Sequence, residues 1–216
     1  MSRTTWFLNA PLAAVALAAA ALVAPVAQAA APAYSVTGDA TYIGDRPNTT
    51  GFIFTAVQNA TVTALGFHDY LLDGLGSAHE VALFSTAGAL LAQATVAAGT
   101  ADVLIGEHRY ATLGASFNLV AGTQYVLAAH TDAADGYRYG TLPFATISAD
   151  PRIAIGLRAG VYNYGPSLAY PGFTIGYDIY ATPNMLMTGV VPEPGTWALL
   201  CAGLVAVAGV ARRRRA

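Results

Sequence analysis

The chain has 216 residues, a formal net charge of −2 and a hydrophobic fraction of 55%. Half of its arginines lie at the two ends, so residues 30–190 carry five arginines against eleven acidic residues, a net charge of −6. This acidic balance excludes a nucleic-acid-binding protein, which needs a basic surface to displace counterions from phosphates. A single cysteine, Cys201, excludes a fold held together by internal disulfides.

The N-terminal residues have the order of charge and hydrophobicity that is typical of a secretory signal peptide. Arg3 supplies the positive charge, residues 12–23 are apolar, and Ala27 and Ala29 have the small-x-small spacing of a cleavage site. This order predicts a signal peptide over residues 1–29, which signal peptidase removes. A retained membrane anchor is the alternative, and Pro25 favours cleavage.

Residues 30–190 are predicted to form one all-β domain, a β-sandwich or jelly roll. Apolar residues alternate with others from Arg152 to Val161, which indicates a strand with one buried face. Glycine and proline interrupt the pattern at short intervals, and no window keeps a helical period. The other predicted strands are residues 52–57, 61–67, 80–84, 90–96, 109–113, 123–130 and 174–179.

Two turns are predicted inside this domain. Residues 85–88 form a hairpin turn, with Gly88 in the left-handed conformation. Leu119, Gly122 and Tyr125 have the spacing of a tyrosine corner, in which the phenol bonds to backbone a few residues upstream. We therefore interpret Tyr125 as a structural residue rather than a functional one.

The last 26 residues, 191–216, combine a rigid turn, an apolar helix and a cationic end. Pro192 and Pro194 prevent a helix from running through residues 191–194. The uncharged run 196–211 predicts a helix of roughly 24 Å, and Arg212–Arg215 can extend its reach to the lipid headgroups. The prediction is a transmembrane helix with its arginines in the cytoplasm. An apolar helix packed on the protein's own core is the alternative, but it would place four arginines at a buried face.

This tail resembles the PEP-CTERM sorting signal of Gram-negative bacteria that make an extracellular polysaccharide. The resemblance implies recognition of Pro192, Glu193 and Pro194 by an exosortase, a membrane-embedded cysteine protease-transpeptidase that removes the tail. Arg212, Arg213, Arg214 and Arg215 would be the retention signal. It implies an exported protein, anchored in the inner membrane as an intermediate and then placed at the cell surface or in the extracellular matrix.

The segment from Thr61 to Tyr125 is similar to sandwich domains of unassigned function that often precede PEP-CTERM tails. The shared pattern comprises residues 73–75, 79–84, 90–92, 109–110 and 119–125. What this similarity implies is architecture, because that family has no agreed activity.

No catalytic motif is complete in the chain. His79-Glu80 begins like a zincin motif, but Leu83 stands where the second histidine would be needed. Glu80 and Glu107 are the glutamates of the domain, and nothing in their spacing selects them as a glycosidase pair. We therefore predict a non-catalytic protein without a resident cofactor, and keep a polysaccharide-active enzyme as an alternative.

Two features could be binding sites. Asp69 and Asp73 lie in a glycine-rich loop whose oxygens could hold Ca²⁺, and the alternative is a solvated connection without a metal. Tyrosines near turns form a potential platform for sugar rings. They are Tyr137, Tyr139, Tyr162 and Tyr164.

Three hypotheses for the function remain. The first is a non-catalytic structural or adhesive protein of the cell surface or matrix. The second is a carbohydrate-binding module for the exopolysaccharide of the same cell. The third is a secreted enzyme.

Overall fold

The computed structural model describes residues 29–43, 47–176, 179–189 and 203–204, and β-strands build the domain in the first three of these ranges. The predicted all-β class is confirmed. One short 3-10 turn, η1 (Tyr70–Leu72), interrupts the described strands of residues 29–189. The predicted signal helix lies outside the described residues, as does the predicted transmembrane helix except for residues 203–204. Among the described residues, no helix has the length and apolarity needed to cross a membrane.

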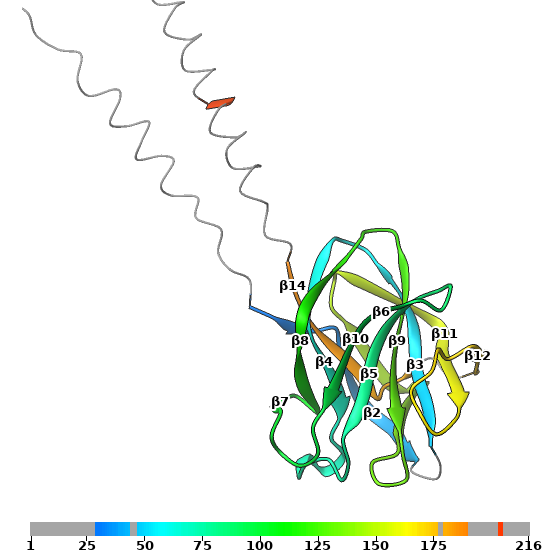
Figure 1. The fold of residues 1–216 in the computed structure, drawn as a ribbon. Coiled ribbons are helices and arrows are strands. Elements are labelled where there is room, and N and C mark those ends of the chain that lie inside the picture. The colour runs from blue at the N-terminus through cyan, green and yellow to red at the C-terminus, as the bar shows by residue number, and fades with distance from the viewer. Residues whose placement is uncertain (1–28, 44–46, 177–178, 190–202, 205–216) are drawn as a thin grey trace, which may run out of the picture. The chain divides into compact units, whose positions relative to one another are not determined.

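The strands form three antiparallel sheets (Figure 1). The five-stranded sheet has the order β1 (Ala31–Pro32), β14 (Pro183–Gly189), β4 (Ala60–His68), β8 (His108–Leu119) and β7 (Val103–Ile105). The six-stranded sheet has the order β12 (Phe173–Thr174), β11 (Ile153–Tyr164), β3 (Asn48–Ala56), β9 (Gln124–Thr131), β5 (His79–Ser85) and β6 (Leu90–Val96). The three-stranded sheet has the order β13 (Ile179–Tyr180), β10 (Tyr137–Ala149) and β2 (Tyr34–Ile43).

The two larger sheets enclose a common hydrophobic core. Alternation along each strand sends every second side chain to the inner face, where burial of apolar surface is the main stabilising term. Fully buried residues come from both sheets and also from the short strand β13. The largest of them are Phe52, Phe54, Phe67, Leu65, Leu83, Leu119, Leu127, Ile179, Met185 and Met187.

The strand predicted over residues 152–161 is interrupted by a bulge. Its pairing with β3 shifts register between Ile155 and Gly160, and Arg158 has a φ of 55°. Leu157, predicted on the buried face, is 78% exposed. The prediction was wrong here because extra residues in one strand reverse the alternation of faces.

The β5–β6 hairpin has the predicted turn, with Gly88 at φ 88° and its N–H donating to the Ser85 carbonyl at 3.0 Å. The two ends of the predicted strand over residues 174–179 belong to the two-residue strands β12 and β13, residues 175–176 are not in a strand, and residues 177–178 lie outside the described residues. Three long strands, β2, β10 and β14, were missed by the sequence analysis.

One end of the domain collects several strand ends that are far apart in sequence. The last residues of β4 pair with the beginnings of two other strands, as Phe67 with Pro183 and His68 with His108. The backbone N–H of Asp69 also donates to the Glu107 carbonyl at 2.9 Å. This end therefore brings together side chains from the β4–β5, β7–β8 and β9–β10 connections.

Candidate functional site

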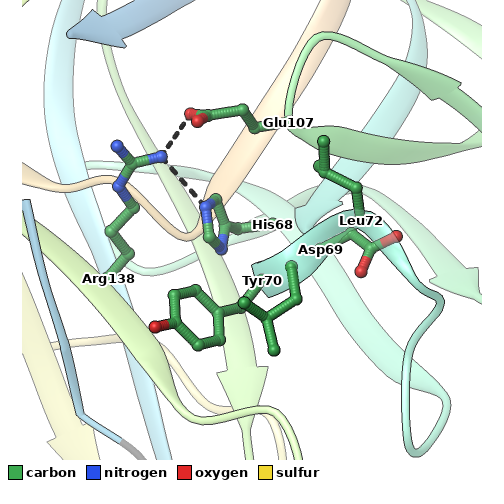
Figure 2. A pocket seen from close by; sticks show the side chains of 7 residues that line it. His68, Asp69, Tyr70, Leu72, Glu107 and Arg138 are labelled. Atoms are coloured by element: carbon green, nitrogen blue, oxygen red, sulfur yellow. Dashed lines mark hydrogen bonds and ion pairs between the residues drawn. The ribbon is translucent and has the colours of Figure 1, made fainter.

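A pocket of about 270 Å³ lies where β4 ends, and Figure 2 shows the side chains that surround it. Its volume is slightly below the range of about 300–1,000 Å³ that is common for small-molecule sites, so it suits a small ligand or one terminal group of a larger one. The lining residues are His68, Asp69, Tyr70, Leu71, Leu72, Glu107 and Arg138.

Arg138 connects the polar groups of the pocket (Figure 2). Its Nη1 donates to His68 Nε2 at 3.0 Å and also to a carboxylate oxygen of Glu107. Because Nε2 accepts this hydrogen bond, the ring proton of His68 is on Nδ1. The Glu107 side chain is 48% exposed and that of Arg138 is 11% exposed, so the ion pair has one solvated and one recessed partner.

His68 is packed against a second histidine, His108, with ring centroids 5.5 Å apart and an interplanar angle of 80°. His108 Nε2 donates to the Ala181 carbonyl at 3.2 Å. Burial, His108 and Arg138 together lower the pKa of His68 to about 2. Burial lowers the pKa of His108 to about 4, and Arg138 adds to this effect against the opposing hydrogen bond to Ala181. Both histidines are therefore neutral at pH 7.

The predicted calcium ligands Asp69 and Asp73 do not form a metal site. The Asp69 side chain is fully buried, and its carboxylate accepts hydrogen bonds from Arg109 Nε at 2.7 Å and from the Gly74 N–H at 3.2 Å. A calcium ion there would face the guanidinium of Arg109 and compete with two donors. Asp73 is exposed at the end of η1. This geometry does not fit the calcium prediction.

The rim of the pocket is apolar and has an unusual backbone. Leu71 and Leu72 have φ values of 72° and 63°, in the left-handed region that residues with a side chain rarely adopt. Tyr70, Leu71 and Leu72 are 49%, 71% and 49% exposed. Strained residues of this kind cluster at ligand sites, where the surrounding structure holds them in place.

The four tyrosines predicted as a sugar platform do not form one surface. Tyr162 and Tyr164 lie together on β11, with ring centroids 5.2 Å apart, and Phe173 joins them at 5.6 Å from Tyr162. Tyr137 is on β10 in another sheet, 5.4 Å from the ring of Tyr180. The side chain of Tyr139 lies outside the described residues. We call Tyr162, Tyr164 and Phe173 the aromatic patch.

Tyr125 is in the position of a tyrosine corner. Its phenol oxygen accepts a hydrogen bond from the Val120 N–H at 3.0 Å, and Gly122 has a φ of 80°. Leu119 is 1% exposed and belongs to the core. The three residues form the β8–β9 turn, at the end of β8 opposite to the pocket.

The two domain glutamates do not converge. Glu80 on β5 accepts a hydrogen bond from Gln93 Nε2 at 2.7 Å, whereas Glu107 is bound by Arg138 in the pocket. His68 and His108 were not among the predicted site residues. No local motif could have joined them to Arg138, which is 70 residues away from His68.

Comparison with known proteins places this architecture in a family. A family model described as a domain of unknown function (DUF4082) matches residues 29–181, which is more than half of the chain. The chain belongs to the DUF4082 family. Every residue that lines the pocket lies within the DUF4082 match, whereas β14 follows it. No curated protein matches the chain.

A second family model, the PEP-CTERM protein-sorting motif, matches residues 190–215. This match confirms the resemblance that was based on the Pro192–Pro194 turn and the terminal arginines. The DUF4082 protein is therefore a substrate of the PEP-CTERM sorting system, and the motif implies export and processing by an exosortase at the membrane. The sorting-motif residues 192–194 and 212–215 lie outside the described structure, as do Ala27 and residue 28 of the predicted signal-cleavage site.

Proposed function

We propose that this protein is a non-catalytic protein of the cell surface or extracellular matrix that binds a neutral saccharide in the pocket beside His68. The PEP-CTERM motif supports delivery to the surface. The observation that carries the ligand proposal is the pocket itself, which combines a half-exposed tyrosine ring with a hydrogen-bonded histidine, arginine and glutamate. The saccharide would be part of the polysaccharide made by the same cell.

The charge of the pocket favours a neutral ligand. The positive charge of Arg138 is balanced by Glu107, and that of Arg109 is balanced by Asp69. Because His68 is neutral, the pocket has no net charge to attract a phosphate or a carboxylate. What it offers is a set of hydrogen-bond donors and acceptors in fixed positions, which is what sugar hydroxyls require.

The rim supplies the apolar half of such a site. Tyr70 presents a ring that can stack on the face of a sugar, while Leu71 and Leu72 exclude water beside it. The aromatic patch on β11 and β12 is the competing location, because Tyr164 and Phe173 are each 58% exposed. We favour the pocket because it adds directional hydrogen bonds to the apolar contacts.

The same geometry favours binding over hydrolysis. A glycosidase needs two carboxyl groups on either side of the scissile bond. In the pocket, Glu107 is bound by Arg138, and Asp69 is buried in its ion pair with Arg109. A polysaccharide-active enzyme remains the alternative, and turnover of a labelled polysaccharide that is lost in a Glu107→Gln variant would support it.

The experiment is a glycan array probed with the full chain in a detergent that has no sugar headgroup. We expect retention of one class of neutral glycan, with affinity reduced about tenfold, ~1.4 kcal/mol, in Tyr70→Ala and unchanged in Tyr164→Ala. The reverse result would assign binding to the aromatic patch. If the wild-type chain binds no glycan on the array, the saccharide part of the proposal is wrong and the structural role alone remains.

The delivery half of the proposal is tested separately. Cells with and without the exosortase are fractionated, and the C-terminus of the protein is determined by mass spectrometry. We expect loss of the Arg212–Arg215 end and release from the inner membrane only when the exosortase is present. A chain that keeps its arginines and is found freely soluble inside the cell would contradict this half.

A further inference from the structure

A second polar cluster lies at the beginning of β5, outside the residues that line the pocket. It consists of His79, Asp132 and Asp135, each of which offers one ligand atom within 4.8 Å of the others. His79 is 2% exposed, while the two aspartates are partly exposed. A metal could therefore reach the cluster through the aspartates, and the histidine would bind it from the protein side.

The orientation of His79 is fixed. Its ring lies flat on Phe67, with centroids 3.8 Å apart and planes 7° apart. Its Nδ1 is 3.0 Å from the backbone carbonyl of His130, which can only accept, so Nδ1 carries a proton. A hydrogen bond from one ring nitrogen to a backbone carbonyl is the usual support for a histidine that ligates a metal through the other nitrogen.

The other ring nitrogen of His79 faces an acceptor. Nε2 is 2.8 Å from Asp135 Oδ2, and the neutral ring offers only a lone pair at Nε2. The nearby hydroxyl of Ser77 donates to Asp132 Oδ2 at 2.5 Å and so does not supply the proton. Two acceptors at this distance need a proton or a cation between them.

Hydrogen-bond donors hold both aspartates in place. The backbone N–H groups of Gly76 and Ser77 donate to Asp135, each at 2.9 Å. Asp132 accepts from the Ser77 hydroxyl and from the backbone N–H groups of Ala134 and Asp135, the latter two at 2.9 and 3.2 Å. Two carboxylates held by these donors thus face one imidazole ring.

We propose that His79 Nε2, Asp132 and Asp135 bind one divalent transition-metal ion, with Zn²⁺ as the preferred metal. One imidazole and two carboxylates form a donor set that suits Zn²⁺, whereas Ca²⁺ needs six to eight oxygen ligands. Zn²⁺ holds such ligands at ~2.0–2.2 Å, so the three atoms, which lie within 4.8 Å of one another, would draw closer around a bound ion. Solvent at the partly exposed aspartates can complete the coordination.

The location gives the metal a structural effect. His79 is the first residue of β5, whereas Asp132 and Asp135 belong to the β9–β10 connection. His79 and Asp135 are 56 residues apart in the sequence. The next strand, β10, begins at Tyr137 and carries Arg138 of the pocket. A bound ion would therefore fix the connection from which Arg138 extends.

The test measures metal binding by the full chain, without a histidine tag, after treatment with EDTA. We expect one equivalent of Zn²⁺ by elemental analysis and calorimetry, and a rise of several degrees in the melting temperature. Asp135→Asn and His79→Gln should each weaken Zn²⁺ binding at least tenfold. Glu80→Gln is the matched control, because Glu80 is the adjacent acid and bonds to Gln93 instead, so this variant should bind like the wild type.

X-ray absorption of the wild-type chain loaded with one equivalent of Zn²⁺ decides the result even where a variant does not fold. Nitrogen and oxygen ligands with imidazole scattering support the site, whereas sulfur scattering would assign the ion to Cys201. The proposal is overturned if the wild-type chain binds no Zn²⁺. Equal Zn²⁺ binding by Asp135→Asn and Glu80→Gln would also overturn it.

Discussion

A buried polar side chain lies at each end of the 69–79 loop, and the two side chains have different partners. At the first end, Asp69 is paired with Arg109, so one negative charge meets one positive charge in a sealed position. At the other end, two aspartates face the single imidazole of His79. The loop between them supplies the Tyr70–Leu72 rim of the pocket.

This comparison distinguishes polar groups that stabilise the fold from polar groups that can bind a ligand. A buried carboxylate whose hydrogen bonds are met by a guanidinium and a backbone N–H has nothing left for a ligand, and its role is to hold the loop. A carboxylate that faces the lone pair of an imidazole nitrogen repels it unless a proton or a metal cation lies between the two atoms. A count of hydrogen-bond donors against acceptors therefore does not favour calcium at Asp69, and it supports the proposed metal site at His79.

The largest expected change in stability is at the buried ion pair between Asp69 and Arg109. Arg109→Met removes the partner of the fully buried Asp69 side chain, and an uncompensated buried charge costs about 3–5 kcal/mol of the free energy of unfolding. Urea denaturation at pH 7 measures the loss. The double variant Asp69→Asn with Arg109→Met should recover a large part of it, because no buried charge remains. A loss below about 1 kcal/mol in the single variant would mean that solvent reaches the ion pair.

The next effect is a dependence of stability on pH at the pocket. Each unfolded histidine takes up a proton near pH 6.5, whereas folded His68 and His108 do so at about pH 2 and 4. Because the unfolded state binds more protons in between, stability is full above pH 6.5 and decreases as the pH falls toward 4. The limiting slope is about 1.4 kcal/mol per pH unit for each histidine.

His68→Gln tests this origin, because glutamine can still accept from Arg138 but does not titrate. Its free energy of unfolding, measured by urea denaturation from pH 7 to 4.5, should fall less steeply than that of the wild type, with a slope smaller by up to about 1.4 kcal/mol per pH unit. An unchanged slope would show that His68 is already protonated in the folded state.

The sequence predicted the regular parts of this fold and missed the parts that depend on pairing. Alternation located β4, β5, β6 and β9, because each has one face in the core. It failed in β11, since the register shift after Ile155 changes the buried face without changing the residue types. The long strands β2 and β10 pair mainly with each other. Alternation was overlooked in β2, where Tyr34, Val36, Ala40 and Tyr42 are separated by polar residues or glycine, whereas Gly140 and Pro143 interrupt the pattern in β10.

The sites were harder to predict for the same reason. Asp69 was chosen as a metal ligand from its neighbours in sequence, but its partner Arg109 is 40 residues away. His79 was dismissed with the incomplete zincin motif, although it meets Asp135 across the β9–β10 connection. The sorting motif was recognisable from the sequence, because its parts are contiguous.

A smaller loss of stability is expected at the β8–β9 turn, which lies at the end of the domain opposite to the pocket and the His79 cluster. Tyr125→Phe removes the acceptor of the Val120 N–H and should cost about 1 kcal/mol of the free energy of unfolding. The pocket and the His79 cluster should keep their ligand affinities, since they lie at the other end of the strands. Tyr162→Phe, a hydroxyl removal in the aromatic patch, is the control and should cost less. Equal losses would indicate that the corner hydrogen bond contributes nothing.

The smallest effect concerns the strained rim of the pocket, where stability and binding should change in opposite directions. Leu71 is 71% exposed at a φ of 72°, so Leu71→Gly gives up little buried surface. Relief of a left-handed backbone is worth about 1–2 kcal/mol and the extra chain entropy of glycine costs about 0.5–1 kcal/mol, which leaves a net gain near 0.5 kcal/mol. The melting temperature should therefore rise by about 1–2 °C.

The same Leu71→Gly variant removes apolar rim surface, so glycan affinity measured by calorimetry should decrease while the domain becomes more stable. Gly74, which already has a φ of 111°, gives the contrasting control. Gly74→Ala should lower the melting temperature, because its Cβ would lie 3.0 Å from the backbone of Gly99. If the Leu71→Gly variant is less stable than the wild type, contacts of the Leu71 side chain contribute more than its left-handed backbone costs. The left-handed conformation of Leu71 and Leu72 would then not be evidence of strain at a ligand site.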